Sequence, residues 1–105
     1  MMEYFAFMKA ELLARRRIVL KEAVFAELLL WKVSKPVRGS GHVYKYSLAL
    51  VSCGVCVIRY DNEAGKGDHK HIGEIETAYR FIDIDRLMID FRRDVERWLD
   101  EDGDV

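Results

Sequence analysis

The residues best suited to chemistry gather in one short stretch, residues 59–71. Within thirteen residues it combines cations, three carboxylates and two imidazoles around a flexible Gly-Lys-Gly segment. Its charged and imidazole-bearing members are Arg59, Asp61, Glu63, Lys66, Asp68, His69, Lys70 and His71. A hairpin with a purely structural role would instead carry Thr, Val or Lys on its open face. The composition therefore indicates that this stretch is the working site.

The geometry of the stretch follows from strand pairing. If residues 65–67 form a three-residue connection, Glu63 faces His69 and Asp61 faces His71 across a hairpin. Side chains alternate between the two faces along a strand. The residues placed on the open face are Arg59, Asp61, Glu63, His69 and His71, and those on the opposite face are Tyr60 and Ile72. This register separates the chemistry from the core.

One chemistry that these residues can support is RNA cleavage without a metal ion. The reaction needs a base for the 2′-hydroxyl proton, an acid for the leaving oxygen and a cation for the charge that develops on phosphorus. A carboxylate beside an imidazole can supply the first two, and a Lys or Arg can supply the third. The catalytic candidates are Arg59, Asp61, Glu63, Lys66, His69 and His71.

The same stretch also contains the ligand types of a divalent metal site. Carboxylate and imidazole groups suit Mn or Zn, and a hydrolytic nuclease would follow from such a site. The candidate ligands are Asp61, Glu63, His69 and His71. Arg59 and Lys66 would place two positive charges beside the metal, so the sequence favours chemistry without a cofactor.

A third interpretation is not enzymatic. Carboxylates that face histidines across a hairpin can be simple surface ion pairs, which contribute little to stability. The charged hairpin would then be a surface for binding another protein.

Length and composition predict one domain over residues 1–105, with an extension at 1–7 and an acidic tail at 100–105. No apolar run is long enough to cross a bilayer and no signal peptide opens the chain, so we expect a cytoplasmic protein without a membrane partner. Residues 1–80 carry 13 Lys and Arg against 9 Asp and Glu, whereas residues 81–105 carry 4 against 9. A moderately basic body with an acidic C-terminal element could bind a polyanion on one side.

The chain before the site reads as strands. Residues 9–20 and 23–33 are expected to be extended, with a turn at Lys21 and Glu22, and residues 1–7 could form an extra edge strand, a frayed end or a partner-binding arm. Pro36 and the Gly39-Ser40-Gly41 run predict a loop over residues 34–41.

Residues 42–51 alternate between apolar and polar positions. A three-residue turn at 52–54 would then pair Leu50 with Cys56, Leu48 with Ile58 and Tyr46 with Tyr60. After the central hairpin we expect a polar connection at 73–77 and a short strand at 79–82.

The C-terminal segment is predicted to be an amphipathic helix. Asp83 is a suitable N-cap, and the apolar residues that follow have helical spacing, at Ile84, Leu87, Met88, Phe91, Val95, Trp98 and Leu99. This stripe requires an apolar sheet face. The predicted fold class is therefore α+β, with an antiparallel meander of about four to six strands and the C-terminal helix packed on one face.

Several segments match the pattern of a known family. They are Lys9-Ala10-Glu11-Leu12-Leu13, Arg17-Ile18-Val19-Leu20, Tyr44-Lys45-Tyr46, Arg59-Tyr60-Asp61-Asn62-Glu63, Gly65-Lys66-Gly67-Asp68-His69 with His71, Tyr79-Arg80-Phe81 and Glu96-Arg97-Trp98. Through them, most of residues 8–99 resembles the TumE-type toxin family of prokaryotic toxin–antitoxin systems. Residues 1–7 precede the usual start of that pattern, and Lys21-Glu22 stands where an Asp/Gly-type turn is usual.

The resemblance implies a toxin with a cognate antitoxin protein, often a DNA-binding repressor, and it does not imply a particular target. Combined with the chemistry of residues 59–71, it predicts a toxin that acts on RNA as a small metal-independent ribonuclease. The alternatives are a metal-dependent nuclease at the same residues, or a non-enzymatic module that binds its antitoxin or a protein target. A homodimer is a further option.

Overall fold

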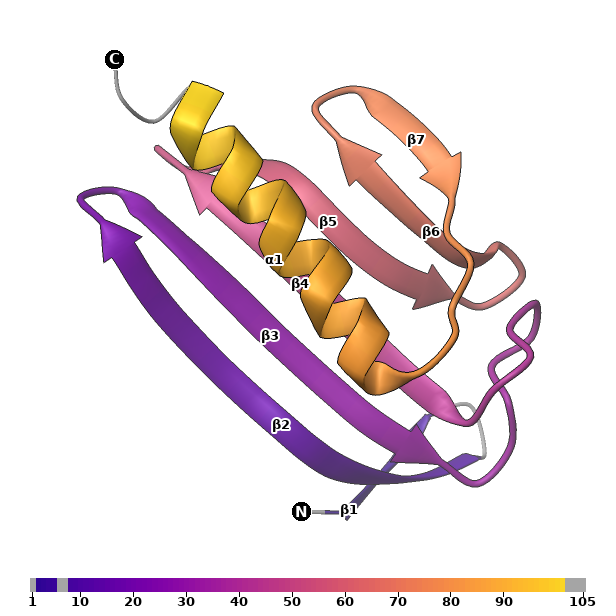
Figure 1. The fold of residues 1–105 in the computed structure, drawn as a ribbon. Coiled ribbons are helices and arrows are strands. Elements are labelled where there is room, and N and C mark those ends of the chain that lie inside the picture. Colours follow the sequence, from indigo (N-terminus) through magenta and orange to yellow (C-terminus); the bar gives the residue numbers. More distant parts are fainter. Residues whose placement is uncertain (1, 6–7, 102–105) are drawn as a thin grey trace.

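Seven β-strands follow one another along the chain, and each pairs antiparallel with the next (Figure 1). They are β1 (Met2–Phe5), β2 (Met8–Lys21), β3 (Val24–Val33), β4 (Tyr44–Ser52), β5 (Val55–Glu63), β6 (Gly67–Ile72) and β7 (Ile75–Ala78), followed by one helix, α1 (Ile84–Glu101). The computed structural model describes residues 2–5 and 8–101. Figure 1 shows α1 lying across one face of the twisted sheet.

This architecture confirms the predicted α+β class, with a meander covered on one face by the C-terminal helix. Strands β2–β7 form the six-strand meander, and β1 adds an edge strand from the N-terminal extension. Asp100 and Glu101 of the expected acidic tail belong to α1, while residues 102–105 lie outside the described residues, as do residues 1, 6 and 7. Within the described part of the chain, no helix has the length and apolar character needed to span a bilayer.

The helix forms where its sequence pattern places it. Asp83 caps the first turn, because its Oδ1 accepts a hydrogen bond of 2.7 Å from the backbone N–H of Arg86. Every member of the predicted apolar stripe packs in the main core, which also takes in buried residues from β3, β4 and β5. The strand residues are Val24, Ala26, Tyr46, Leu48, Leu50, Ile58 and Tyr60. The opposite face of the sheet has no helix over it among the described residues (Figure 1).

Two turns differ from the predicted ones. The β4–β5 turn has two residues, Cys53 and Gly54, both at positive φ, where three residues were expected. Such a turn matches the twist of the two strands that it joins. A β-bulge between Leu50 and Val51 then shifts the strand pairing by one more residue. Leu50 therefore lies opposite Ile58, and Leu48 lies opposite Tyr60, two residues from the expected pairing.

The β2–β3 turn is formed by Glu22 and Ala23, one residue later than predicted.

The last strand was also misplaced. Residues 73–77 were predicted to be a connection and residues 79–82 a strand, whereas β7 spans Ile75–Ala78 and residues 79–83 form the connection to α1. A two-residue turn at Gly73 and Glu74, with Gly73 at φ 61°, lets β7 pair directly with β6. All four β7 residues are exposed, so their sequence lacks the apolar alternation that would mark a strand.

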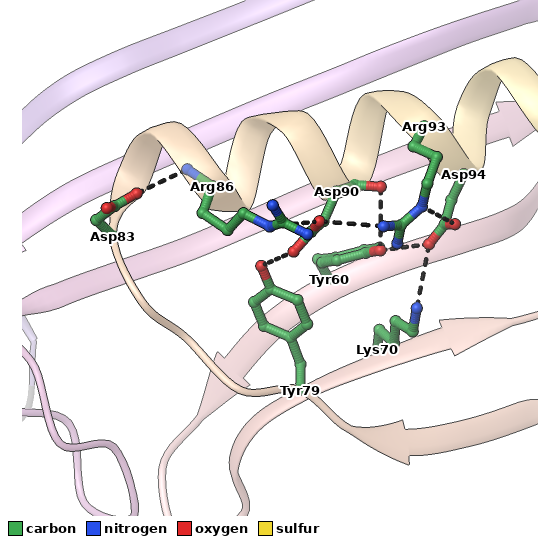
Figure 2. Close-up of polar contacts among 8 residues, drawn as sticks. All are labelled: Tyr60, Lys70, Tyr79, Asp83, Arg86, Asp90, Arg93 and Asp94. Carbon is green, nitrogen blue, oxygen red and sulfur yellow. Dashed lines mark hydrogen bonds and ion pairs between the residues drawn. The ribbon is translucent and has the colours of Figure 1, made fainter.

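A polar network fastens the helix to β5 and β6 (Figure 2). The buried carboxylate of Asp94 accepts a hydrogen bond from the Tyr60 hydroxyl and lies 3.3 Å from Lys70 Nζ. One turn earlier, Asp90 accepts a hydrogen bond of 2.6 Å from the Tyr79 hydroxyl and pairs with Arg86. These partners compensate the cost of burying two carboxylates.

Replacing Asp94 with Asn should destabilise the fold in a pH-dependent way. Burial alone would raise the pKa of Asp94, but the hydrogen bond from Tyr60 and the charge of Lys70 outweigh burial and lower it. A carboxyl whose pKa is lowered by folding stabilises above its ordinary pKa, and that stability is lost as the pH falls through the folded pKa. Asp94→Asn should therefore cost about 1–3 kcal/mol at pH 7, and this cost should begin to fall near pH 4 and keep falling as the pH drops toward the lowered folded pKa.

Urea unfolding followed from pH 7 to pH 3 measures this difference. The matched control is Glu96→Gln, which removes an exposed ion pair with Arg92 on the same helix. The control should change the free energy of unfolding by less than about 1 kcal/mol at every pH. A cost of Asp94→Asn that stays constant across this range would contradict the assignment.

Candidate active site on the open sheet face

Strand pairing brings functional side chains into two neighbouring rows on the open face. Residues directly opposite each other in an antiparallel pair share a face, so each row can be followed from strand to strand. From β2 to β7, one row is Arg17, Glu27, Ala49, Arg59, His71 and Glu76. The row beside it is Arg15, Leu29, Ser47, Asp61, His69 and Ala78.

The register of the β5–β6 hairpin differs from the predicted one. Asp61 lies opposite His69, Arg59 lies opposite His71, and Glu63 lies opposite Gly67. The predicted pairs of Glu63 with His69 and Asp61 with His71 are therefore wrong, because the turn comprises residues 64–66 and Gly67 already belongs to β6. The shift is two residues, an even number, so the same side chains still leave the same face.

Three of the predicted residues form a tight cluster. Asp61 Oδ1 lies 2.6 Å from His69 Nε2, and the rings of His69 and His71 are 5.1 Å apart between centroids. One donor atom from each of Asp61, His69 and His71 lies within 4.8 Å of the others. Glu76 of β7 approaches from the side, with its Oε1 at 3.9 Å from Nε2 of both histidines.

The orientation of the His69 ring is held by the backbone. His69 is buried, and its Nδ1 lies 2.9 Å from the carbonyl oxygen of Gly67. A carbonyl oxygen can only accept, so Nδ1 carries the proton and Nε2 points toward Asp61. Asp61 Oδ1 is itself buried and has no hydrogen bond to any residue that the structure describes. The contact therefore joins a ring nitrogen to an unsatisfied carboxylate oxygen.

All six predicted site residues line one shallow groove of about 360 Å³ around this cluster. Lys66 lies at its rim, with Nζ 4.0 Å from a carboxylate oxygen of both Glu63 and Glu76. Glu63 is mostly exposed and forms no ion pair with His69 or His71. Arg59 is exposed beside His71 and makes no ion pair with the described residues. The cluster thus contains fewer residues than the stretch 59–71 in which the site was predicted.

Glu76 is the site residue that the sequence analysis missed. It was assigned to a connection, where its side chain would have had no fixed direction. The signal that could have located it is Gly73, since a two-residue turn after Ile72 places Glu76 opposite His71.

The remaining polar residues of the stretch serve the fold. Asp68 points to the helix side, where its carboxylate accepts hydrogen bonds from Ser40, from His42 at 2.7 Å and from Tyr46 at 2.7 Å. Burial, together with the bond to Asp68, raises the pKa of Tyr46 far above its ordinary value. His42 also accepts a hydrogen bond from the backbone N–H of Tyr44, so both of its ring nitrogens are satisfied.

A second groove, of about 670 Å³, continues the open face toward β2. The small side chains of Ser47 and Ala49 lie along its middle, while Arg15 and Arg17 line one side and Arg59 the other. Arg16 and Glu27 line this groove as well, and Glu27 forms an ion pair with Arg17. Arg59 lines both grooves, so the arginine-lined groove leads into the cluster groove.

Fold and site together define a small α+β protein with a charged, open sheet face that carries a histidine–carboxylate cluster. A family model described as Toxin TumE matches residues 6–99, and the chain belongs to this family. It is therefore the toxin of a toxin–antitoxin module and has a cognate antitoxin as its partner. No curated protein and no solved structure matches the chain.

Replacing Gly67 with Ala should disturb both the fold and the site. An added Cβ would lie 2.7 Å from the carbonyl oxygen of Gly39, and Gly67 has a φ of 74°. The combined clash and backbone strain should cost about 1–3 kcal/mol, which lowers the melting temperature by on the order of 10 °C. Thermal unfolding measures the change.

Two further glycine variants separate the causes. Gly73→Ala has a similar φ of 61° but no atom within 4 Å of the added Cβ, and Gly41→Ala has neither problem. The melting temperature should fall most for Gly67→Ala, less for Gly73→Ala and least for Gly41→Ala. Equal effects at residues 67 and 73 would show that the contact with Gly39 is unimportant.

Proposed function

We propose that this toxin cleaves RNA, with the open sheet face as its binding surface and the Asp61, His69 and His71 cluster as its reactive centre. The observation that carries the proposal is the continuity of the two grooves through Arg59. An RNA backbone bound along the arginine-lined groove would reach the cluster without leaving the face. Backbone binding by cations needs no particular base sequence.

The arginine-lined groove suits a flexible, single-stranded polyanion. Arg15 and Arg17 extend from β2, with Arg17 paired to Glu27 of β3, and Arg59 faces them from β5 across β3 and the small residues of β4. Strands in a sheet are spaced by about 4.8 Å, so three strand spacings separate the β2 arginines from Arg59 by about 14 Å. That span suits several consecutive phosphates better than one small anion.

The cluster contains the groups that phosphodiester cleavage requires. Imidazole is the side chain best suited to proton transfer near neutral pH, and His71 is the more accessible of the two, with about one third of its side chain exposed. Arg59 and Lys66 lie at the edge of the same groove, where their charges can stabilise a phosphate that gains negative charge. Asp61 and the Gly67 carbonyl position the His69 ring.

A surface that serves binding alone accounts less well for these contacts. Exposed ion pairs at an interface would be solvated and need no fixed imidazole orientation. Here His69 is buried and its ring is oriented by the Gly67 carbonyl, while Asp61 Oδ1 lies 2.6 Å from Nε2 and is left without a hydrogen bond among the described residues. Unsatisfied buried polar atoms of this kind are costly and are concentrated at functional sites.

Incubation of the purified toxin with total RNA tests the proposal. The wild-type protein should fragment RNA in a buffer with MnCl2, in one with EDTA, or in both. His71→Gln should slow cleavage by about 100-fold or more, because it removes the accessible imidazole. Circular dichroism should show an unchanged fold for this half-buried position.

The matched control is Glu74→Gln, an exposed carboxylate in the β6–β7 turn outside the cluster. Its cleavage rate should equal that of the wild type. RNA that stays intact in both buffers, or a His71→Gln variant as fast as the wild type, would refute cleavage at this site.

Replacing Arg15 with Gln should weaken RNA binding without changing the chemical step. Arg15 is exposed in the arginine-lined groove, away from the cluster. The variant should raise KM several-fold, leave kcat unchanged and reduce the slope of log affinity against log salt by about 0.7, the value for one lost contact with a single strand. Arg97→Gln on the exposed side of α1 is the charge-matched control and should leave KM unchanged.

A further inference from the structure

We propose that Asp61, His69 and His71 bind one divalent transition-metal ion of the Mn or Zn class, with Glu76 beside them as an additional carboxylate. The inference deepens the proposed function by naming a cofactor for the same site. With the ion bound, His71 is a ligand, and it is the proton-transfer group only in the metal-free route that the sequence favoured.

The first argument is the convergence of the donor atoms. The two histidines lie two residues apart on one strand, so both rings leave the open face, and Asp61 faces them from the neighbouring strand. Their donor atoms already lie within 4.8 Å of one another. Donors bound to one ion at about 2.1 Å are roughly 3–4 Å apart, so closure requires a shift of about 1 Å. The partly exposed ring of His71 can make that shift by rotation.

The second argument is the tautomer of His69. Its Nδ1–H donates to the Gly67 carbonyl, which leaves the lone pair of Nε2 directed into the cluster. A histidine that binds a metal commonly has its other ring nitrogen held by a carbonyl or carboxylate in this way. The carbonyl of Gly67, the first residue of β6, thus directs Nε2 of His69 into the cluster as a ligand.

The third argument is the state of Asp61. Its Oδ1 lies 2.6 Å from His69 Nε2. It nevertheless forms no hydrogen bond with the described residues, so a well-directed N–H···O bond does not explain this short distance. Two electron-rich atoms this close require a positive charge, which either a proton on Nε2 or a bound cation can supply. A metal ion bound by both atoms would satisfy the buried Oδ1 atom, and the two atoms would separate from 2.6 Å to the roughly 3–4 Å that two ligands of one ion have.

The charge balance of the groove permits a dication. Asp61, Glu63 and Glu76 supply three negative charges, whereas Lys66 and Arg59 supply two positive ones. Lys66 Nζ lies 4.0 Å from a carboxylate oxygen of Glu63 and of Glu76. These two carboxylates offset the repulsion between its charge and a bound cation. The objection raised by the sequence, that two cations would crowd a metal, is met by Glu76, which the sequence had not assigned to the site.

When bound, such an ion would polarise a phosphate oxygen or activate a water molecule. Two imidazoles and one carboxylate leave coordination positions open for such a ligand. His69 and Asp61 would hold the ion, and Arg59 would bind the neighbouring phosphate from the arginine-lined groove.

Metal binding is tested on the full chain, first stripped with chelator and then titrated separately with MnCl2 and ZnCl2. Isothermal calorimetry, together with the loss of the free Mn signal in electron paramagnetic resonance, should give one equivalent per chain for at least one of the two ions. His71→Ala and Asp61→Asn should each weaken binding by at least about 10-fold. Glu74→Gln should bind as the wild type does. His71→Ala is the primary variant because His71 is only half-buried, and circular dichroism checks its fold.

The outcomes separate this inference from the proposed function. One equivalent that is lost in both variants supports the site. Absence of binding by both ions, or binding that His71→Ala and Asp61→Asn leave unchanged, overturns it. If the site fails but RNA is cleaved in EDTA, cleavage stands without the metal. If the ion binds but RNA stays intact, the metal site stands and RNA cleavage falls.

Discussion

The contact of Asp94 in α1 with Tyr60 and Lys70 of the sheet fixes which face of the sheet the helix covers (Figure 2). Tyr60 and Lys70 are directly opposite each other on β5 and β6, and both point to the helix side, where they compensate one buried carboxylate. Because side chains alternate, the neighbours of these two residues must point the other way. Asp61 adjoins Tyr60, and His69 and His71 adjoin Lys70. The interaction that fastens α1 to the sheet therefore also turns the cluster toward the open face.

The two faces of the sheet differ in what they contain. The helix side contains the main core and the networks around Asp68, Asp90 and Asp94, in which buried charges are paired. The open side has a small apolar cluster around Trp31, and beside it small residues with long charged ones around them, which creates grooves. Among the described residues one helix covers one face of the sheet, and the other face is the one for which we propose RNA binding.

Periodicity predicted much of this arrangement, and turn geometry accounts for most of what it missed. The helix stripe, the Asp83 cap and the alternation along β5 and β6 follow from spacing alone, so the face of every candidate site residue was correct. Register depends on the conformation of a few turn residues, and both hairpins around β5 were displaced by two residues. The even shift preserved the faces but exchanged the partners, so Asp61 and not Glu63 meets His69. Glu76 was missed because β7 is exposed on all its residues and carries no apolar signal.

The central claim is that Asp61, His69 and His71 leave one face together and form a single cation-binding, RNA-cleaving centre. X-ray diffraction from crystals soaked with MnCl2 or, separately, with ZnCl2, recorded near the absorption edge of the soaked metal, tests the arrangement most directly. The account predicts one strong anomalous peak between the Asp61 carboxylate and the two imidazoles, about 2.1–2.3 Å from the donor atoms. Crystals in which these three side chains diverge, or in which the anomalous signal lies elsewhere, would contradict it.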